Sequence, residues 1–129
     1  MNWRVNLKNM REYNFRGWDA VGDKGWVYGD LVHNQKVTET GLEPRVMVCG
    51  YEVVPESVGL CTGLKDEKNE EVYEGDILQW GFRRYVCEFC EGSFVFRDLG
   101  DGKLILNAMV FHAHIVSNVY QNKELLDNE

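Results

Sequence analysis

Residues 62–77 read TGLKDEKNEEVYEGDI, and they constrain the fold more than any other part of this sequence. Gly63 and Gly75 allow backbone angles that residues with a Cβ avoid. Other residues carry short side chains that hydrogen-bond to nearby backbone amides, namely Asp66, Asn69 and Asp76. The pattern predicts a loop, a tight turn, a short strand and a second turn, which leads into an apolar strand at Ile77. No nucleophile motif, metal cluster or phosphate loop occurs in it, so its first interpretation is architectural.

Upstream of this stretch, the sequence predicts a hairpin and then short strands. Residues 12–18 alternate with a period near two, which is typical of a strand. Pro55 ends the last strand of this half because it has no N–H to donate to a ladder. In chain order we expect a strand at 12–18, a turn at 19–25, a strand at 26–32, a polar loop at 33–41, short strands at 45–49 and 52–54, and a helical turn at 56–58.

Downstream of Asp76 the strand pattern is clearer. Gly81 and the pair Glu91-Gly92 suit tight connections between strands, and residues 98–102 are the strongest turn signal in the sequence. We expect strands at 77–80, 84–89, 93–97, 103–106 and 114–120, with an ambiguous segment at 108–113 and one helical turn at 123–126. About five short antiparallel strands with alternating aromatic residues predict a small barrel.

Length and composition set the class of protein. A chain of 129 residues, 44% hydrophobic, suits one domain or two very small ones that share a core. No apolar run is long enough to cross a membrane, and the N-terminus lacks the apolar core of a signal peptide. We therefore expect a cytoplasmic protein without a membrane partner. In that compartment its cysteines would be free thiols, at Cys49, Cys61, Cys87 and Cys90.

The formal charge of −7 argues against non-specific nucleic-acid binding, which depends on Lys and Arg side chains. It leaves room for a local basic patch. The acidic residues concentrate between positions 56 and 76, namely Glu56, Asp66, Glu67, Glu70, Glu71, Glu74 and Asp76. A solvated face explains them most simply. The sharper alternative is a phosphate-mimicking or partner-docking surface.

Two arrangements suggest chemistry, and each has a simpler explanation. Cys87-x-x-Cys90 with His112-x-His114 has zinc-type ligands, but residues three apart in a strand point to opposite faces. A ribonuclease-like site would use Arg83 or Arg84 as phosphate ligands, with Asp76 or Glu88 as the base. An arginine beside a carboxylate on the strands of a barrel is more often a surface ion pair than a catalytic site. We therefore expect no metal, no cofactor and no catalysis.

The aromatic residues offer a second binding hypothesis. Most of them should fill the core, in the set Trp18, Trp26, Tyr28, Trp80, Tyr85, Phe94 and Phe96. Exposed aromatic rings beside arginine mark protein contacts or stack on bases. The arginines to consider are Arg11, Arg16, Arg45, Arg83, Arg84 and Arg97. A nucleic-acid face would be built from Arg83, Arg84 and Tyr85.

Three ordered motifs stand out, namely the central TGLKDEKNEEVYEGDILQW, the opening MRE with FRGWD at residues 10–19, and the closing IVSNVYQNKELL at residues 115–126. Together they resemble the YopX family of proteins encoded by bacteriophages and prophages. The family turn usually has Asn-Gly where this chain has Asn69-Glu70, and a non-glycine residue in a left-handed conformation costs about 1 kcal/mol. Residues 1–9 precede the usual family start.

The resemblance implies a small SH3-like antiparallel barrel preceded by a β-rich dimerisation segment. We expect an N-terminal extension at 1–9, a dimerisation subdomain at 10–60, the barrel at 61–123 and a frayed acidic tail at 124–129. The function expected is that of a non-catalytic homo-oligomer in the bacterial host cytoplasm, which binds a phage or host macromolecule. Candidate partner-binding residues are Arg16, Trp18, Asp19, Asp66, Glu74 and Asp76. The alternatives are a nucleic-acid-binding protein and a ribonuclease-like or metal-dependent enzyme.

Overall fold

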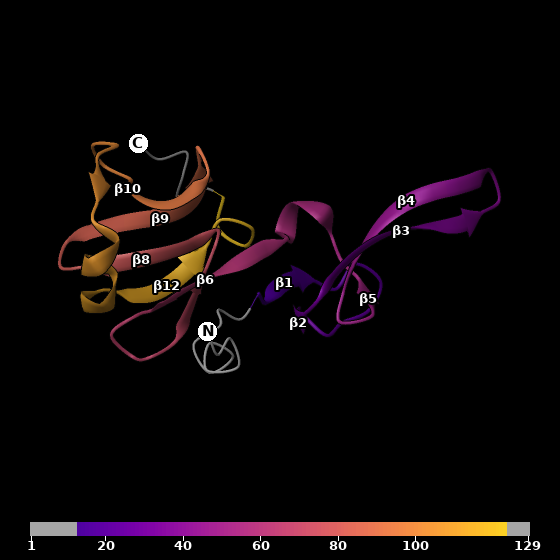
Figure 1. Ribbon diagram of the computed structural model, residues 1–129, viewed down its shortest axis with the longest axis horizontal. Coiled ribbons are helices and arrows are strands. Elements are labelled where there is room, and N and C mark those ends of the chain that lie inside the picture. The colour runs from indigo at the N-terminus through magenta and orange to yellow at the C-terminus, as the bar shows by residue number, and fades with distance from the viewer. Residues whose placement is uncertain (1–12, 124–129) are drawn as a thin grey trace, which may run out of the picture.

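Tight turns divide the chain into short antiparallel strands, which form two lobes joined side by side (Figure 1). The computed structural model describes residues 13–123. The strands are β1 (Phe15–Trp18), β2 (Trp26–Gly29), β3 (Leu31–Thr38), β4 (Gly41–Val48), β5 (Tyr51–Glu52), β6 (Gly59–Lys65), β7 (Glu71–Tyr73), β8 (Asp76–Trp80), β9 (Arg83–Cys90), β10 (Ser93–Asp98), β11 (Leu104–Ile105) and β12 (His114–Asn118). Within residues 13–123 two 3-10 helices accompany them, η2 (Pro55–Ser57) and η3 (Asn107–His112). None of the helices described is long and apolar enough to cross a membrane.

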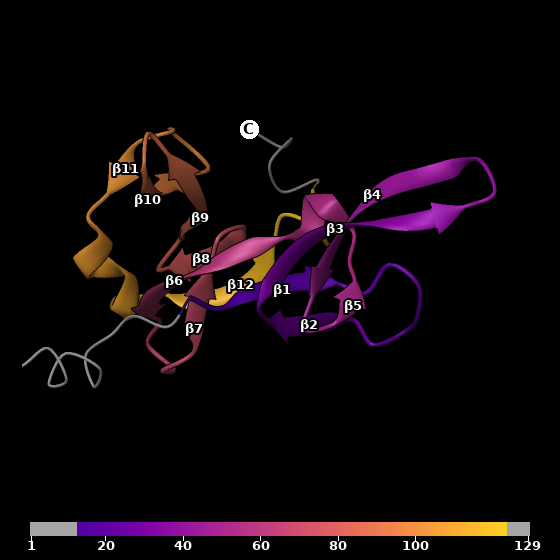
Figure 2. The same ribbon diagram turned by 45° about the vertical axis from the view of Figure 1, so that its right-hand side comes forward.

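The N-terminal lobe, which contains β1 to β5 and η2, is built on two small sheets. One has the order β2-β1-β6-β7, and the other has the order β3-β4-β5. A small core fills the space between them, where Val27, Val48 and Val53 are buried. Strand β6 then leaves this lobe and runs toward the second one (Figures 1 and 2). The two lobes are therefore connected by a continuous strand.

Strands β3 and β4 form a long hairpin, the arm, that projects from the N-terminal lobe (Figure 1). Their ladder runs without interruption from Leu31 opposite Val48 to Thr38 opposite Gly41. Only the base of the arm is covered by the lobe, because β5 pairs with β4 at Met47 and Val48 alone. The prediction of a polar loop at residues 33–41 is wrong.

The C-terminal lobe contains a five-stranded antiparallel sheet with the order β11-β10-β9-β8-β12, together with η3. Its core is larger, and Leu78, Tyr85, Phe96 and Val110 are buried in it. The turn between β9 and β10 holds Glu91 and Gly92 at φ 51° and 85°, the positive values that a two-residue type I′ turn requires. Turn chemistry thus fixes the register of this sheet.

The prediction of a mainly β fold with antiparallel sheets is confirmed. Strands β8, β9 and β10 lie where the sequence predicts them, and η2 is the expected helical turn before Gly59. The start of residues 62–77 continues strand β6 instead of looping out, and Gly63 takes φ 83° where the β6–β7 register shifts. Closure into an SH3-like barrel, dimerisation and the division at residues 60 and 61 stay predictions. The extension at 1–9, Arg11 and the tail at 124–129 lie outside the described residues.

Candidate functional site

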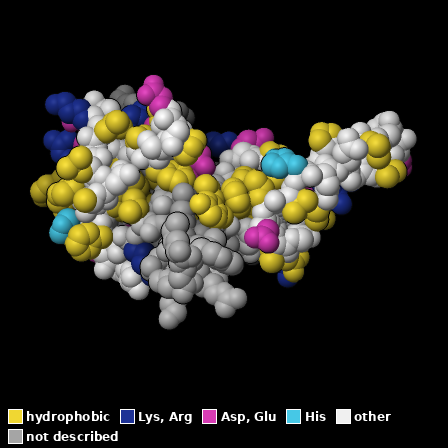
Figure 3. Space-filling model, in the orientation of Figure 1, with side chains coloured by type: hydrophobic (Ala, Val, Ile, Leu, Met, Phe, Trp, Pro, Cys, Tyr) yellow, Lys and Arg dark blue, Asp and Glu magenta, His cyan; other side chains and the backbone are white. Residues whose placement is uncertain are grey.

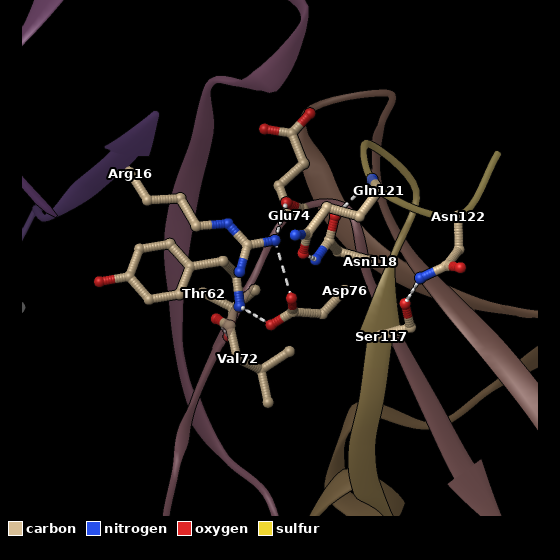
Figure 4. A network of polar contacts seen from close by, with 10 residues as sticks. Arg16, Thr62, Val72, Glu74, Asp76, Ser117, Asn118, Gln121 and Asn122 are labelled. Atoms are coloured by element: carbon tan, nitrogen blue, oxygen red, sulfur yellow. Dashed lines mark hydrogen bonds and ion pairs between the residues drawn. The ribbon is translucent and has the colours of Figure 1, made fainter. Parts of the chain in front are cut away.

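Arg16 and Asp76 meet at the seam between the two lobes (Figure 4). Strand β1 carries Arg16, β8 begins at Asp76, and Arg16 Nη2 lies 2.7 Å from Asp76 Oδ1. The second carboxylate oxygen, Asp76 Oδ2, accepts the backbone N–H of Tyr73 at 2.8 Å. Both side chains are buried, with 8% and 2% of their surfaces exposed. The pair therefore ties the N-terminal lobe to the first strand of the C-terminal sheet.

Aromatic rings surround this ion pair. The Arg16 guanidinium lies 4.5 Å from the centre of the Trp26 ring and 5.1 Å from that of Tyr73. Arg16 Nε is buried, and no hydrogen-bond partner for it occurs among the described residues. Burial raises the pKa of Asp76, and the nearby Arg16 charge partly offsets that rise. Burial likewise raises the pKa of Tyr73 to about 12.

The backbone around Glu74 completes the seam. Arg16 Nη2 lies 3.4 Å from the Glu74 carbonyl oxygen. Gly59 packs against the same oxygen, since a Cβ at that position would lie only 2.5 Å from it. Three of the candidate partner-binding residues, Arg16, Glu74 and Asp76, are thus brought together. Their contacts hold the lobes, and whether they bind a partner stays a prediction.

Asp19 and Asp66 organise turns away from this seam. Asp19 accepts the backbone N–H groups of Val21, Gly22 and Lys24 at 3.1–3.3 Å. These bonds, led by that of Gly22, hold the pKa of Asp19 below its ordinary value.

The carboxylate of Asp66 joins the β6–β7 turn to strand β12 of the C-terminal lobe. Its Oδ1 accepts the N–H groups of Lys68 and Glu70 at 2.9 Å, and its Oδ2 accepts that of Ile115 in β12 at 3.0 Å. Within the same turn Asn69 takes φ 65°, the left-handed conformation that asparagine tolerates well. Asp66 is only 3% exposed, so its position in the fold is architectural.

Trp18 belongs to an aromatic cluster on the N-terminal lobe. Its ring meets Trp26 edge to face at 5.3 Å, and Tyr120 packs on both at 5.9 Å. Tyr120 follows β12, so the cluster brings the end of the C-terminal lobe onto β1 and β2. Trp18 is half-buried in this arrangement.

The candidate nucleic-acid residues do not form one face. Arg83 pairs with Asp98 at 2.6 Å and with Asp101 at 3.3 Å. Arg84 is exposed beside a groove that also contains Phe82, but the Tyr85 ring is 4% exposed and lies in the core. Neighbouring residues in a strand point to opposite faces, which separates Arg84 from Tyr85. Nucleic-acid binding by this set stays a prediction.

The candidate metal ligands are also dispersed. Cys87 is buried, and burial raises the pKa of its thiol, whereas Cys90 is exposed. His112 stacks on Trp80 at 5.7 Å, and His114 Nδ1 lies 3.0 Å from Glu67 Oε1. Within residues 13–123, no group of three or more His, Cys, Asp or Glu side chains is placed to hold a metal ion.

Sequence reasoning missed the exposed apolar side chains. Val37 and Leu42 on the arm are 84% and 64% exposed, and Phe82 at the β8–β9 turn is fully exposed. The C-terminal lobe exposes Leu106 and Phe111 as well, at 75% and 61%. The signal available for the arm was the alternation of apolar residues across positions 42–48, but Pro44 interrupts it.

The fold and the sequence both have relatives. The family model described as "YopX protein" matches residues 14–127. Among solved structures, the crystal structure of protein EF1440 from Enterococcus faecalis is similar with a TM-score of 0.55, at 19% sequence identity. The likeness covers 91% of this chain and 99% of that chain, and at this identity it establishes a shared fold. No curated protein matches the chain.

Proposed function

The chain belongs to the YopX family, and from this premise we propose that it is a non-catalytic, homo-oligomeric accessory protein. It binds a phage or host macromolecule in the bacterial cytoplasm. Its arm makes the contact between copies.

One face of the arm carries this proposal. Residues directly opposite each other in an antiparallel ladder share a face. The pairs on one face are Leu31 with Val48, His33 with Val46, Gln35 with Pro44, and Val37 with Leu42. At the base of the arm, Val48 is fully buried, and Leu31 and Val46 pack against the same core. This face therefore carries core residues of the lobe at its base, exposed His33 and Gln35 in its middle, and the exposed apolar pair Val37 and Leu42 near its tip.

The opposite face of the arm is mostly polar beyond Val32 and Met47 at its base, and several of its polar side chains have partners. Arg45 Nε donates to Asn34 Oδ1 at 2.7 Å, and Lys36 Nζ lies 2.9 Å from Glu52 Oε2. A two-stranded hairpin is marginally stable in water unless one face packs on something. The polar face needs no cover, and the apolar face does. A second copy of the chain supplies it.

We infer the absence of catalysis from the contacts that the candidate catalytic side chains make with other residues. Asp76, the base considered for a ribonuclease-like site, is held by Arg16 and by the Tyr73 N–H. Arg83, the phosphate ligand considered, is held by Asp98 and Asp101. A side chain with such contacts would have to break them to reach a substrate. These contacts favour a structural role for both residues.

Light scattering of the purified chain tests the assembly. We expect the wild type to have at least twice the chain mass. Val37→Lys with Leu42→Lys should reduce this to the mass of one chain, because two charges would be buried in the contact. Val21→Lys is the matched control, since Val21 is 79% exposed on the β1–β2 turn, away from the arm. A monomeric wild type would overturn the proposal.

Affinity capture from prophage-carrying cells tests the partner. The lysate is divided, and one half is treated with nuclease before capture by the tagged wild-type chain. Macromolecules retained in both halves would support a protein partner. Retention only in the untreated half would favour the nucleic-acid alternative, and Arg83→Ala with Arg84→Ala should then reduce it.

A further inference from the structure

A groove of about 550 Å³ lies where strands β1 and β2 approach β7. Tyr28 and Tyr73 form an aromatic part of its wall, with their rings edge to face at 5.6 Å, and Ile115 contributes an aliphatic side chain. Tyr73 is buried, whereas Tyr28 is 48% exposed although its ring lies against Tyr73. The groove therefore offers apolar surface that residues 13–123 leave partly open to water.

The charges of the groove are not balanced. Its charged side chains are one cation, Arg16, and three carboxylates, those of Asp76, Glu70 and Glu71. Arg16 and Asp76 are paired at 2.7 Å, whereas Glu70 and Glu71 are exposed at the rim. Lys65 lies opposite Glu71 in the β6–β7 ladder, but it does not line the groove, and among the described residues no ion pair holds either glutamate. The groove therefore favours a cationic occupant.

The residues that precede the described part of the chain have the complementary chemistry. Trp3, Val5 and Leu7 alternate with polar residues in the sequence WRVNLK. Alternation with a period of two puts apolar and polar side chains on opposite faces of an extended chain. The polar positions include Arg4 and Lys8, and this segment contains no Asp or Glu. It therefore combines one apolar face with two positive charges.

The described chain begins beside this groove. Asn14 lines it, and the Asn14 side-chain amide donates to the Tyr73 hydroxyl at 2.8 Å. The Asn14 carbonyl oxygen accepts the N–H of Cys61 at 2.8 Å, which holds this end of the described chain against β6. Residues 9–13 can span up to about 17 Å, enough for the chain to turn back over the groove. The segment WRVNLK is thus tethered next to the groove at a high effective concentration.

We propose that residues 3–8, the N-terminal segment, bind in this groove of the same chain. The apolar face of the segment packs on the tyrosine rings. Its two cations, whose long side chains extend past an apolar contact, reach the carboxylates of Glu70 and Glu71. A partner of the same chemistry, an extended basic peptide with alternating apolar residues, would have to displace the segment. The contact does not depend on the proposed homo-oligomer.

Limited proteolysis of the full chain tests the contact. Trypsin cleaves after the arginine and the lysine of the N-terminal segment, and this cleavage follows the population in which the segment has left the groove. Glu70→Gln with Glu71→Gln removes two surface ion pairs and should speed the cleavage about fivefold. Trp3→Ala with Leu7→Ala should speed it by at least about tenfold, because apolar burial is lost.

Two controls accompany these variants. Glu39→Gln with Glu43→Gln removes two exposed carboxylates from the arm, which projects clear of both lobes (Figures 1 and 3), and it should leave the cleavage unchanged. A free peptide of residues 1–12, with and without the substitutions in the segment, gives the cleavage rate without the groove. Circular dichroism checks that each variant is folded.

Zero-length cross-linking of the full chain with a carbodiimide identifies the carboxylates that receive the segment. We expect an amide bond between Lys8 and Glu70 or Glu71 within one chain. Mass spectrometry of a mixture of isotope-labelled and unlabelled protein separates links within a chain from links between chains. The proposal requires both results. Cleavage that neither pair of substitutions accelerates would overturn it, and so would a lack of these links or their formation only between chains.

Discussion

The β9–β10 hairpin and the β3–β4 arm both pair strands through tight turns, but the arm is packed against a core only at its base. On β10 the Phe96 side chain is fully buried, and on β9 Tyr85 and Cys87 are almost as deeply buried. On the arm, Val37 is 84% exposed although it lies on the same face of the ladder as the buried Val48.

The difference shows that strand pairing and burial are separate contributions in this chain. Backbone ladders form in both hairpins with a continuous register. The free energy of burying apolar surface, roughly 25 cal/mol per Å², is gained within the chain by the first hairpin and, in the arm, only at its base. For the distal part of the arm it would become available only in a contact between copies, which is why we propose that the arm mediates assembly.

The largest effect should come from the core of the C-terminal lobe. Phe96→Ala removes a fully buried ring and leaves a cavity that the surrounding sheet fills only in part. We expect the free energy of unfolding to fall by about 4 kcal/mol. Urea denaturation followed by circular dichroism measures it. A loss below about 1 kcal/mol would mean that this sheet is no better packed than the arm.

The second-largest loss of stability should come from a substitution at the seam between the lobes. Asp76→Ala leaves the buried Arg16 guanidinium without its counter-charge, and we expect a loss of about 3 kcal/mol. Arg16→Met with Asp76→Leu removes both charges and should recover much of this loss. If the double variant were as unstable as Asp76→Ala, the packing at the seam would matter more than the charges.

Much of the C-terminal fold could be predicted from the sequence because its signals are local. Glu91-Gly92 marks a tight turn, and the flanking strands alternate toward one core. The arm could not be predicted in this way. Residues 33–36 are all polar, and their strand conformation depends on pairing with residues 43–46 across the hairpin.

The candidate site was predictable only as a set of residues. Arg16 and Asp76 were both singled out, but nothing in a single sequence shows that strands β1 and β8 bring them within 2.7 Å. Tyr85 could have been separated from Arg84 by strand periodicity alone, since adjacent side chains point to opposite faces. The exposed Phe111 had no local signal, because an apolar segment reads as core until the neighbouring elements are placed.

Acid sensitivity should be shared by the two lobes, since each has a turn held by an aspartate. The pKa of Asp19 is lowered from 3.8 by its backbone hydrogen bonds, that of Gly22 first. Burial raises the pKa of Asp98, but Arg83 and the backbone N–H groups outweigh it, so this pKa is lowered as well. Folded carboxylates of this kind bind fewer protons than unfolded ones, so their stabilisation is present above pH 3.8 and is lost as the pH falls through the folded pKa.

Asp19→Asn and Asp98→Asn should therefore each reduce the loss of stability between pH 5 and pH 2. Urea denaturation across this range measures it, with Asp101→Asn as a control whose side chain contacts the same arginine from a more exposed position. Unchanged acid sensitivity in one variant would show that the turn of that lobe is held by its backbone instead of its carboxylate.

The smallest effect on the single chain should come from the arm. Val37→Ala removes two methyl groups that are already in water, so the free energy of unfolding of the dissociated chain should change by less than about 0.5 kcal/mol. The measurement is made at a concentration at which light scattering finds only monomer, and Val21→Ala provides a control of similar exposure. If copies assemble through the arm as proposed, the same substitution should weaken association, because the side chain would then be buried against the neighbouring copy. A loss in the monomer comparable with that of Phe96→Ala would mean that the chain covers its own arm, and the contrast between the two hairpins would disappear.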